Sequence, residues 1–381
     1  MWFVALGSLS DPRHIPLAAA HGPDQIRWLT KLDREYGNLR AALTYLQSSA
    51  GTLRRTAPSA GHPEGLRVVA ALGYFWIRRG YFDEGNRWID AFLPQSAKPT
   101  REEAKALHWK SWIYYCLGDN SAALDISRIT LKKAKAAGYR NGMALSLAWT
   151  GFLETGQGQK GISMALADKD PWTIVQSLYF TYTQPVPRKP KEIDSDRIRA
   201  WFEDAIRQLH SEGDLWGIAI GRHGLADMLR DHFGLAEEAC PHYLESLALF
   251  RRLNDRWMTA NTLRCLGTAE LMRDSLKEAE QCLRESLLLL DETGAHGLVT
   301  VLLGLFGQLA ERSGDHGRSA CLYGSRSKIS NMLSETVSPR LQKRDRERRK
   351  EYEAYGPDIG AQWERGRRMS IREATAYALE G

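Results

Sequence analysis

The sequence lacks any long apolar run, and no stretch reaches the roughly 18 consecutive apolar residues that a membrane-spanning helix needs. The apolar start, Met1–Leu6, is not preceded by basic residues and is too short for the core of a signal peptide. We therefore expect a cytoplasmic protein without a membrane partner.

Cysteine is scarce as well. The chain of 381 residues has five cysteines, which are widely spaced and lie within apolar sequence: Cys116, Cys240, Cys265, Cys282 and Cys321. Their number is odd, so they cannot all pair with one another. Disulfide frameworks and zinc sites use closely spaced or paired cysteines. The pattern predicts reduced thiols in a core, and it predicts no metal site.

Most of the net positive charge lies in one short segment. The chain carries +6, but residues 340–350 alone carry +5, which leaves +1 elsewhere. This basic segment has interspersed acids at helical spacing, which favours a solvated helix face. Contact with phosphate or with an acidic partner is the alternative, and we expect direct nucleic-acid binding to be the weaker of these interpretations.

What the chain does contain is an internal repeat. Gly234, Asp274 and Gly314 lie 40 residues apart, and a small residue follows each of them five positions later. The series continues toward the N-terminus through Gly118 and Gly80, and Gly158 also fits its spacing. A sharp turn followed by a small contact residue is typical of antiparallel helices that approach closely, and such hairpins bury their apolar faces by stacking. We predict an all-α fold, a right-handed superhelical solenoid of about six tetratricopeptide-like helical hairpins, longer than the usual period of about 34 residues.

The same reading divides the chain into segments. Residues 1–20 are unassigned, 21–48 form an N-terminal helix of the repeat domain, 49–64 a linker, 65–331 the solenoid, and 332–381 C-terminal capping helices. Residues 157–194 break the periodicity with four prolines and an apolar, β-favouring stretch, 172–182. We expect an irregular insertion there, at a rim where partners bind.

Two motifs suggest a nucleotide-binding site and a metal site, and the sequence around each argues against that interpretation. Residues 156–161 match Gly-x-Gly-x-x-Gly, but the text before them is helical, whereas the dinucleotide fingerprint follows a strand. His223, Asp227 and Asp231 recur at four-residue steps and suggest a metal site, which polar side chains near a repeat turn explain more simply. We expect no catalytic residue, no cofactor and no metal, and hence not an enzyme.

The concave face is the more useful candidate site. In tetratricopeptide stacks the first helix of each hairpin lines this face, so inward positions are counted back from the turn. They yield an effector- or peptide-binding set that mixes aromatic area with orienting polar groups: Tyr74, Lys105, His108, Trp112, Tyr115, Asn261, Arg264 and Gln308. For Tyr74, Trp112 and Tyr115, packing between repeats is an equally good interpretation.

Several segments carry a family resemblance. Residues 22–29, 32–43 and 80–89 near the start, and 363–374 with 377–379 near the end, resemble the tetratricopeptide sensor region of LuxR-like and AfsR-like STAND regulators, which are bacterial signal-transduction ATPases. In those regulators an ATPase core precedes this region and many members carry a DNA-binding domain. This chain has no Gly-x-x-x-x-Gly-Lys-Ser/Thr phosphate loop, so the resemblance implies only the sensor and scaffold role.

From these observations we hypothesise a non-enzymatic tetratricopeptide-repeat protein. It would bind a protein, a peptide or a small effector as the sensor or scaffold part of a bacterial signalling or transcriptional regulator. An ATPase or DNA-binding partner would come from another chain. The alternatives are a structural assembly scaffold and a nucleic-acid-associated regulator that uses the basic helix at 340–350.

Overall fold

The computed structural model describes residues 22–56, 63–93, 98–154, 158–183, 194–333 and 339–380, and within these ranges the chain is helical with no strand. Fourteen helices form seven successive packed pairs: α3 (Pro63–Arg79) with α4 (Phe82–Phe92), α5 (Arg101–Leu117) with α6 (Asn120–Ala136), α7 (Arg140–Leu153) with α8 (Gly158–Asp168), α9 (Pro171–Tyr182) with α10 (Ser195–Glu212), α11 (Leu215–Phe233) with α12 (Ala236–Arg252), α13 (Arg256–Met272) with α14 (Leu276–Thr293), and α15 (Val299–Arg312) with α16 (His316–Leu333).

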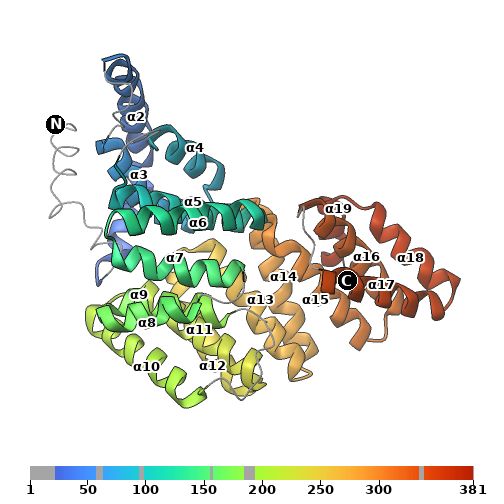
Figure 1. Ribbon diagram of the computed structural model, residues 1–381. Coiled ribbons are helices and arrows are strands. Elements are labelled where there is room, and N and C mark those ends of the chain that lie inside the picture. Colours follow the sequence, from blue (N-terminus) through green and yellow to red (C-terminus); the bar gives the residue numbers. More distant parts are fainter. Residues whose placement is uncertain are drawn as a thin grey trace.

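The remaining elements are α2 (Gln25–Thr56) at one end, the short 3₁₀ helix η2 (His296–Leu298), and α17 (Pro339–Ala354), α18 (Pro357–Arg368) and α19 (Ile371–Leu379) at the other. Figure 1 shows a curved array of stacked helices from which α2 projects, with α15–α19 as a unit at the C-terminal end. The predicted all-α solenoid is confirmed. In the part of the chain that the structure describes, no helix is both long and apolar enough to cross a bilayer.

The repeat turns adopt the backbone that the sequence predicts. Gly80, Gly118, Gly234 and Gly314 have φ of +74°, +94°, +71° and +81°, and Asp274 has φ of +62°. This left-handed region suits glycine, and a short polar residue such as Asp tolerates it. Each turn therefore reverses the chain within a few residues.

The small residues after the turns are the contact points between paired helices. Ala123, Ala239, Ala279 and Ser319 are fully buried. Ser319 also donates a hydrogen bond of 2.7 Å from Oγ to the carbonyl oxygen of Gly307 on the preceding helix. A larger side chain there would push the paired helices apart. All five cysteines are free thiols and four are buried, as predicted.

The predicted linker at 49–64 is wrong in its first half. Helix α2 continues through Thr56, and α3 begins at Pro63. Gly51 does not end the helix, because one glycine lowers helix stability by only about 1 kcal/mol. Earlier in α2, Tyr36 accepts a hydrogen bond of 2.7 Å from Trp76 Nε1, which anchors the helix to α3.

The irregular insertion predicted at 157–194 is also wrong where the structure describes it. Residues 158–168 and 171–182 are helices α8 and α9, and Gly158 starts a helix instead of forming a turn. Asp170 caps α9 by accepting a hydrogen bond from Thr173 N, and every residue of α9 except Trp172 is buried. Because α9 packs between α7 and α11, burial and capping outweigh the β propensity of its residues.

The stack closes on itself. Helix α3 packs against α13 as well as against α5, and Arg79 Nη1 donates to the carbonyl oxygens of Leu253 and Asn254 at 3.0 and 2.7 Å. Gln25 Nε2 donates to Asp214 Oδ1 at 2.7 Å across 189 residues of sequence. The first helices of six repeats, α3, α5, α7, α9, α11 and α13, thus form a closed circle. We call this circle of helices and its interior the ring.

Candidate functional site

The ring is filled by aromatic side chains and is not an open groove along its length. Trp112 is 2% exposed, and six rings from α5, α7, α9, α11 and α13 have centroids within 5.3–6.5 Å of its own. Tyr74 is 5% exposed and packs against Trp109 and Trp216. Packing between repeats therefore accounts for Tyr74 and Trp112, whereas Tyr115 is half-buried against Trp149 and Phe152.

Two of the predicted residues, Lys105 and His108, open together onto a cavity of about 340 Å³, which we call the inner cavity. It lies where the N-terminal ends of α5, α7, α9 and α11 converge. Its wall consists of Arg101, Ala104, Lys105, His108, Trp109, Thr130, Tyr139, Asn141, Gly142, Leu145, Asp170, Trp172, Thr173, Glu212 and Asp214. Its size and its mixture of aromatic and polar groups are typical of small-ligand sites.

One part of the inner cavity is cationic. Arg101 Cζ and Lys105 Nζ lie 4.6 and 5.9 Å from the centroid of the Tyr139 ring. Neither cation forms an ion pair with a carboxylate of the described residues. Burial, and then the like charge of Arg101, lower the pKa of Lys105 to about 8, since both disfavour the ammonium form.

His108 adds a neutral polar group. It is 7% exposed, and burial lowers its pKa to about 4, so the imidazole is uncharged at neutral pH. No hydrogen-bond partner for its Nε2 is found among the described residues. Buried polar atoms are nearly always hydrogen bonded, so an unsatisfied nitrogen on a residue that lines a cavity makes this residue a candidate for contact with a ligand.

Two acidic side chains of the cavity wall cap helices. Asp170 accepts hydrogen bonds from Thr173 N at 3.0 Å and from Asn141 Nδ2 at 3.3 Å. Asp214 accepts from Gly217 N at 2.8 Å and caps α11. Both carboxylates are thereby engaged by their own helices.

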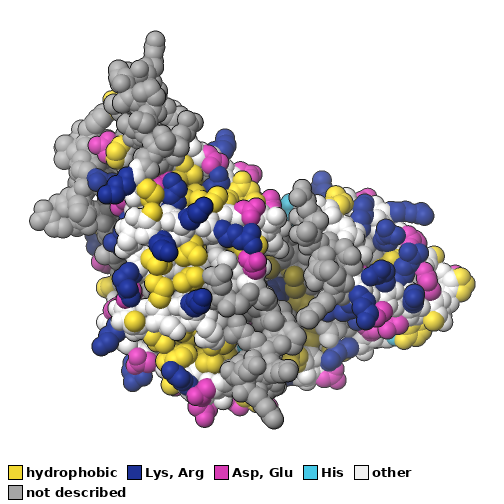
Figure 2. All heavy atoms as spheres, viewed as in Figure 1, with side chains coloured by type: hydrophobic (Ala, Val, Ile, Leu, Met, Phe, Trp, Pro, Cys, Tyr) yellow, Lys and Arg dark blue, Asp and Glu magenta, His cyan; other side chains and the backbone are white. Residues whose placement is uncertain are grey.

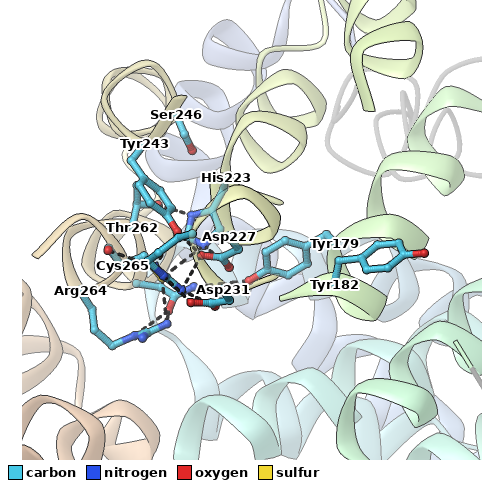
Figure 3. Close-up of polar contacts among 12 residues, drawn as sticks. Tyr179, Tyr182, His223, Asp227, Asp231, Tyr243, Ser246, Thr262, Arg264 and Cys265 are labelled. Carbon is cyan, nitrogen blue, oxygen red and sulfur yellow. Dashed lines mark hydrogen bonds and ion pairs between the residues drawn. The ribbon is translucent and has the colours of Figure 1, made fainter. Parts of the chain in front are cut away.

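Arg264 lies elsewhere, beside a buried polar network (Figure 3), and its guanidinium contacts Asn261. His223 Nδ1 lies 2.9 Å from Thr262 Oγ1, and its Nε2 lies 3.3 Å from Asp227 Oδ2. Burial alone would lower the pKa of His223, but the charge of Asp227 outweighs it and raises the pKa to about 9. The network therefore holds an imidazolium between α11 and α13.

The network also bears on the alternative metal site. Ligand atoms of His223, Asp227 and Cys265 lie within 4.8 Å of one another. However, Asp227 already accepts a hydrogen bond from Tyr243 and lies 3.1 Å from the guanidinium of Arg230. A guanidinium in that position supplies the positive charge that a metal ion would bring, which favours a structural role. Arg264 Nη2 donates to Asn261 Oδ1 at 2.9 Å, so these two predicted residues contact each other on the edge of the network.

Gln308 lies on a second cavity of about 590 Å³ between α15, α16 and α17. Arg344 and Arg348 of α17 line it too, and Arg348 stands 3.8 Å above the Tyr323 ring. In Figure 2, Lys and Arg side chains gather over the C-terminal helices. The basic segment is helical there, and its residues 343–350 are mostly solvent-exposed, with Asp345 turned inward onto Arg326.

The sequence reasoning missed Arg101, Tyr139, Asp170 and Trp172 of the inner cavity. Counting inward positions back from the turn glycine reaches the middle of each first helix, whereas these residues lie at the helix starts. Thr100 and Asp170 are N-cap residues. A search for such caps would have located the helix starts. Trp172 was lost because the insertion was misassigned.

Comparison with known proteins supports the fold alone. No family model and no curated protein matches the chain. Among solved structures, a Rap protein complexed with competence and sporulation factor aligns over 93% of this chain and 98% of its own, with a TM-score of 0.50 and 12% identity. The apo form of RapI aligns over 90% and 85% with a TM-score of 0.34 and 11% identity. An assembly chaperone of RpL4 aligns over 76% and 99% with a TM-score of 0.27 and 16% identity.

Proposed function

We propose that this chain is a non-enzymatic helical-repeat protein that captures a peptide or a small effector in the inner cavity. The observation that carries the proposal is the wall that His108, whose buried Nε2 has no described partner, shares with two cations, Arg101 and Lys105, neither of which forms an ion pair with a described carboxylate. Most buried polar groups are hydrogen bonded within the protein, and one on a residue that lines a cavity can be completed by a ligand. The solved Rap protein of similar fold is itself a complex with a factor, which agrees with such a role.

The position of the cavity suggests how binding is transmitted. Its wall draws on α5, α7, α9 and the start of α11, so one ligand contacts several repeats. Repeats in a solenoid are held mainly by their neighbours, and a ligand that bridges them stabilises the arrangement it binds. A partner that recognises this arrangement would then respond to the ligand.

We place this sensor in a bacterial signalling or transcriptional regulator, on the basis of the resemblance to the LuxR-like and AfsR-like STAND regulators. The partner would be a protein, and an ATPase or DNA-binding chain is the kind that such regulators use. This assignment depends on sequence segments at both ends of the repeat region, 22–43 and 363–379.

The test is capture from extract of the source cells by three immobilised full-length proteins. Wild type is compared with Asn141→Trp, which places an indole in the inner cavity, and with Gln281→Trp, which adds the same group on an exposed position of α14. Bound peptides and small molecules are released and identified by mass spectrometry, then synthesised and titrated.

We expect a ligand that wild type and Gln281→Trp retain and Asn141→Trp loses. Equal retention by all three proteins would contradict a role for the inner cavity. Chemical cross-linking in the same extract identifies the protein partner, and its recovery should depend on the ligand.

A further inference from the structure

The geometry points to a ligand that carries a carboxylate on an aromatic or apolar body, with the carboxylate bound at the α5–α7 end of the inner cavity. This inference rests on the proposed function, since it names the class of ligand for that site. Such a group occurs in free aromatic acids and at the C-terminus of a short peptide, and the experiment below separates the two.

The first support is a contrast among the cations of neighbouring helices. Lys133 pairs with Glu103 at 2.8 Å, and Lys110 pairs with Asp90. Lys105 and Arg101 line the cavity, and neither has such a carboxylate among the described residues. A half-buried ammonium beside a like charge is unfavourable, and an entering carboxylate relieves both the desolvation and the repulsion.

The second, independent support is His108. The residue lines the cavity, and its buried Nε2 has no hydrogen-bond partner among the described residues. The neutral ring carries one N–H, which can be donated to a ligand oxygen without placing another charge in the interior. An oxygen of the proposed carboxylate therefore satisfies this otherwise unpaired nitrogen.

The third support is the start of α7. Thr100, Asp170 and Asp214 cap α5, α9 and α11 with their side chains, whereas Tyr139 at the start of α7 makes no side-chain cap. The first turn of α7 includes Asn141 and Gly142, which line the cavity. Free N–H groups and the positive end of the helix dipole favour an anion at such a position.

The acidic side chains of the wall restrict where the carboxylate lies. Asp214 caps the start of α11 and Glu212 ends α10, so negative charge is disfavoured on that side, while Asp170 accepts a hydrogen bond from Asn141 and borders the α7 side. The ligand body then contacts Trp109 and Trp172. Aromatic walls favour an apolar or aromatic body over a compact anion such as phosphate.

The experiment uses matched probes and the full-length protein. N-acetyl-L-phenylalanine and its carboxamide have nearly the same shape and differ in charge, and Gly-Gly-Phe presents the same carboxylate at a peptide end. Ligand-observed NMR at pH 7 measures the affinity of each. We expect the acid to bind about tenfold or more tightly than the carboxamide, because charge-assisted hydrogen bonds are stronger than neutral ones.

The variants locate the effect. Lys105→Met and the exposed Arg101→Gln should each reduce the preference for acid over carboxamide severalfold, while Lys277→Met, exposed on α14, should leave it unchanged. Tighter binding of Gly-Gly-Phe than of the acetylated amino acid identifies a peptide end as the ligand, and the reverse order identifies a free acid.

Two results would overturn the inference: equal affinity for acid and carboxamide, or no binding of any probe at millimolar concentration. The first leaves the proposed function standing if Asn141→Trp abolishes binding of both probes. In the second case the proposed function is decided by the extract capture. Binding that persists in Asn141→Trp would contradict both.

Discussion

Trp112 offers a test of whether a predicted inward residue binds a ligand or packs in the core, because the sequence allows both interpretations. Its side chain is 2% exposed at the centre of the ring, surrounded by His108, Trp109, Trp149 and Phe180 among others, and it does not line the inner cavity. We predict that Trp112→Ala destabilises the whole ring.

The magnitude follows from the buried area. A tryptophan buries on the order of 200 Å², which at about 25 cal/mol per Å² corresponds to roughly 5 kcal/mol of transfer free energy. Alanine keeps a part of this. Trp112 Nε1 also has no hydrogen-bond partner among the described residues, so its removal returns about 1 kcal/mol or more. The net loss should be about 3–4 kcal/mol, within the usual range for such truncations.

The assay is urea unfolding followed by far-ultraviolet circular dichroism. Trp112→Phe, which keeps a ring and removes the unpaired N–H, should lose less than about 1.5 kcal/mol. Trp88→Ala, a half-buried tryptophan on α4, should lose about 1–2 kcal/mol. A Trp112→Ala protein within about 1 kcal/mol of wild type would refute the packing argument, and loss of ligand binding alone would restore the groove interpretation.

Further predictions concern the polar network, the ring closure and α2. Asp227→Asn should lower the free energy of unfolding by about 3 kcal/mol at pH 7 in urea titrations, because the buried His223 cation loses its carboxylate and Arg230 keeps only Asp231. Folding raises the pKa of His223 from about 6.5 to about 9, so its contribution is complete below pH 6.5 and falls as the pH rises toward 9; a difference between wild type and Asp227→Asn that stays constant over that interval would refute this. Gly297→Ala places a methyl group 2.7–2.9 Å from two carbonyl oxygens of α5 and should speed hydrogen exchange at α5, whereas unchanged exchange would contradict the contact. Gly37 has open space around it in α2, so Gly37→Ala should add about 0.5–1 kcal/mol to the free energy of unfolding and raise the thermal midpoint slightly.

The candidate site was predictable only in part. Lys105 and His108 were found because inward positions of α5 follow from helical periodicity and the location of Gly118. The same rule selected Trp112, which lies one turn further along α5 and meets the filled centre of the ring instead of a cavity. Whether an inward side chain reaches open space depends on how far the facing repeats stand away, and that distance is not a local property.

The insertion shows a different limit. Residues 172–182 are rich in residues that favour strands, and their helical state comes from the capping Asp170, from Pro171 at the first helical position and from burial between α7 and α11. Propensity differs among such residues by less than burial contributes, so the tertiary contacts decide.

The sequence by itself determined the hairpins. Glycine or aspartate at each turn permits a positive φ, and a small residue five positions later permits the close helix contact, and both requirements act within a few residues. Only the tertiary structure decided that the stack closes into a ring. Closure sums small rotations over six repeats and joins groups such as Gln25 and Asp214, 189 residues apart, so it has no local signature. That closure fills the centre of the concave face and leaves the inner cavity at the helix starts.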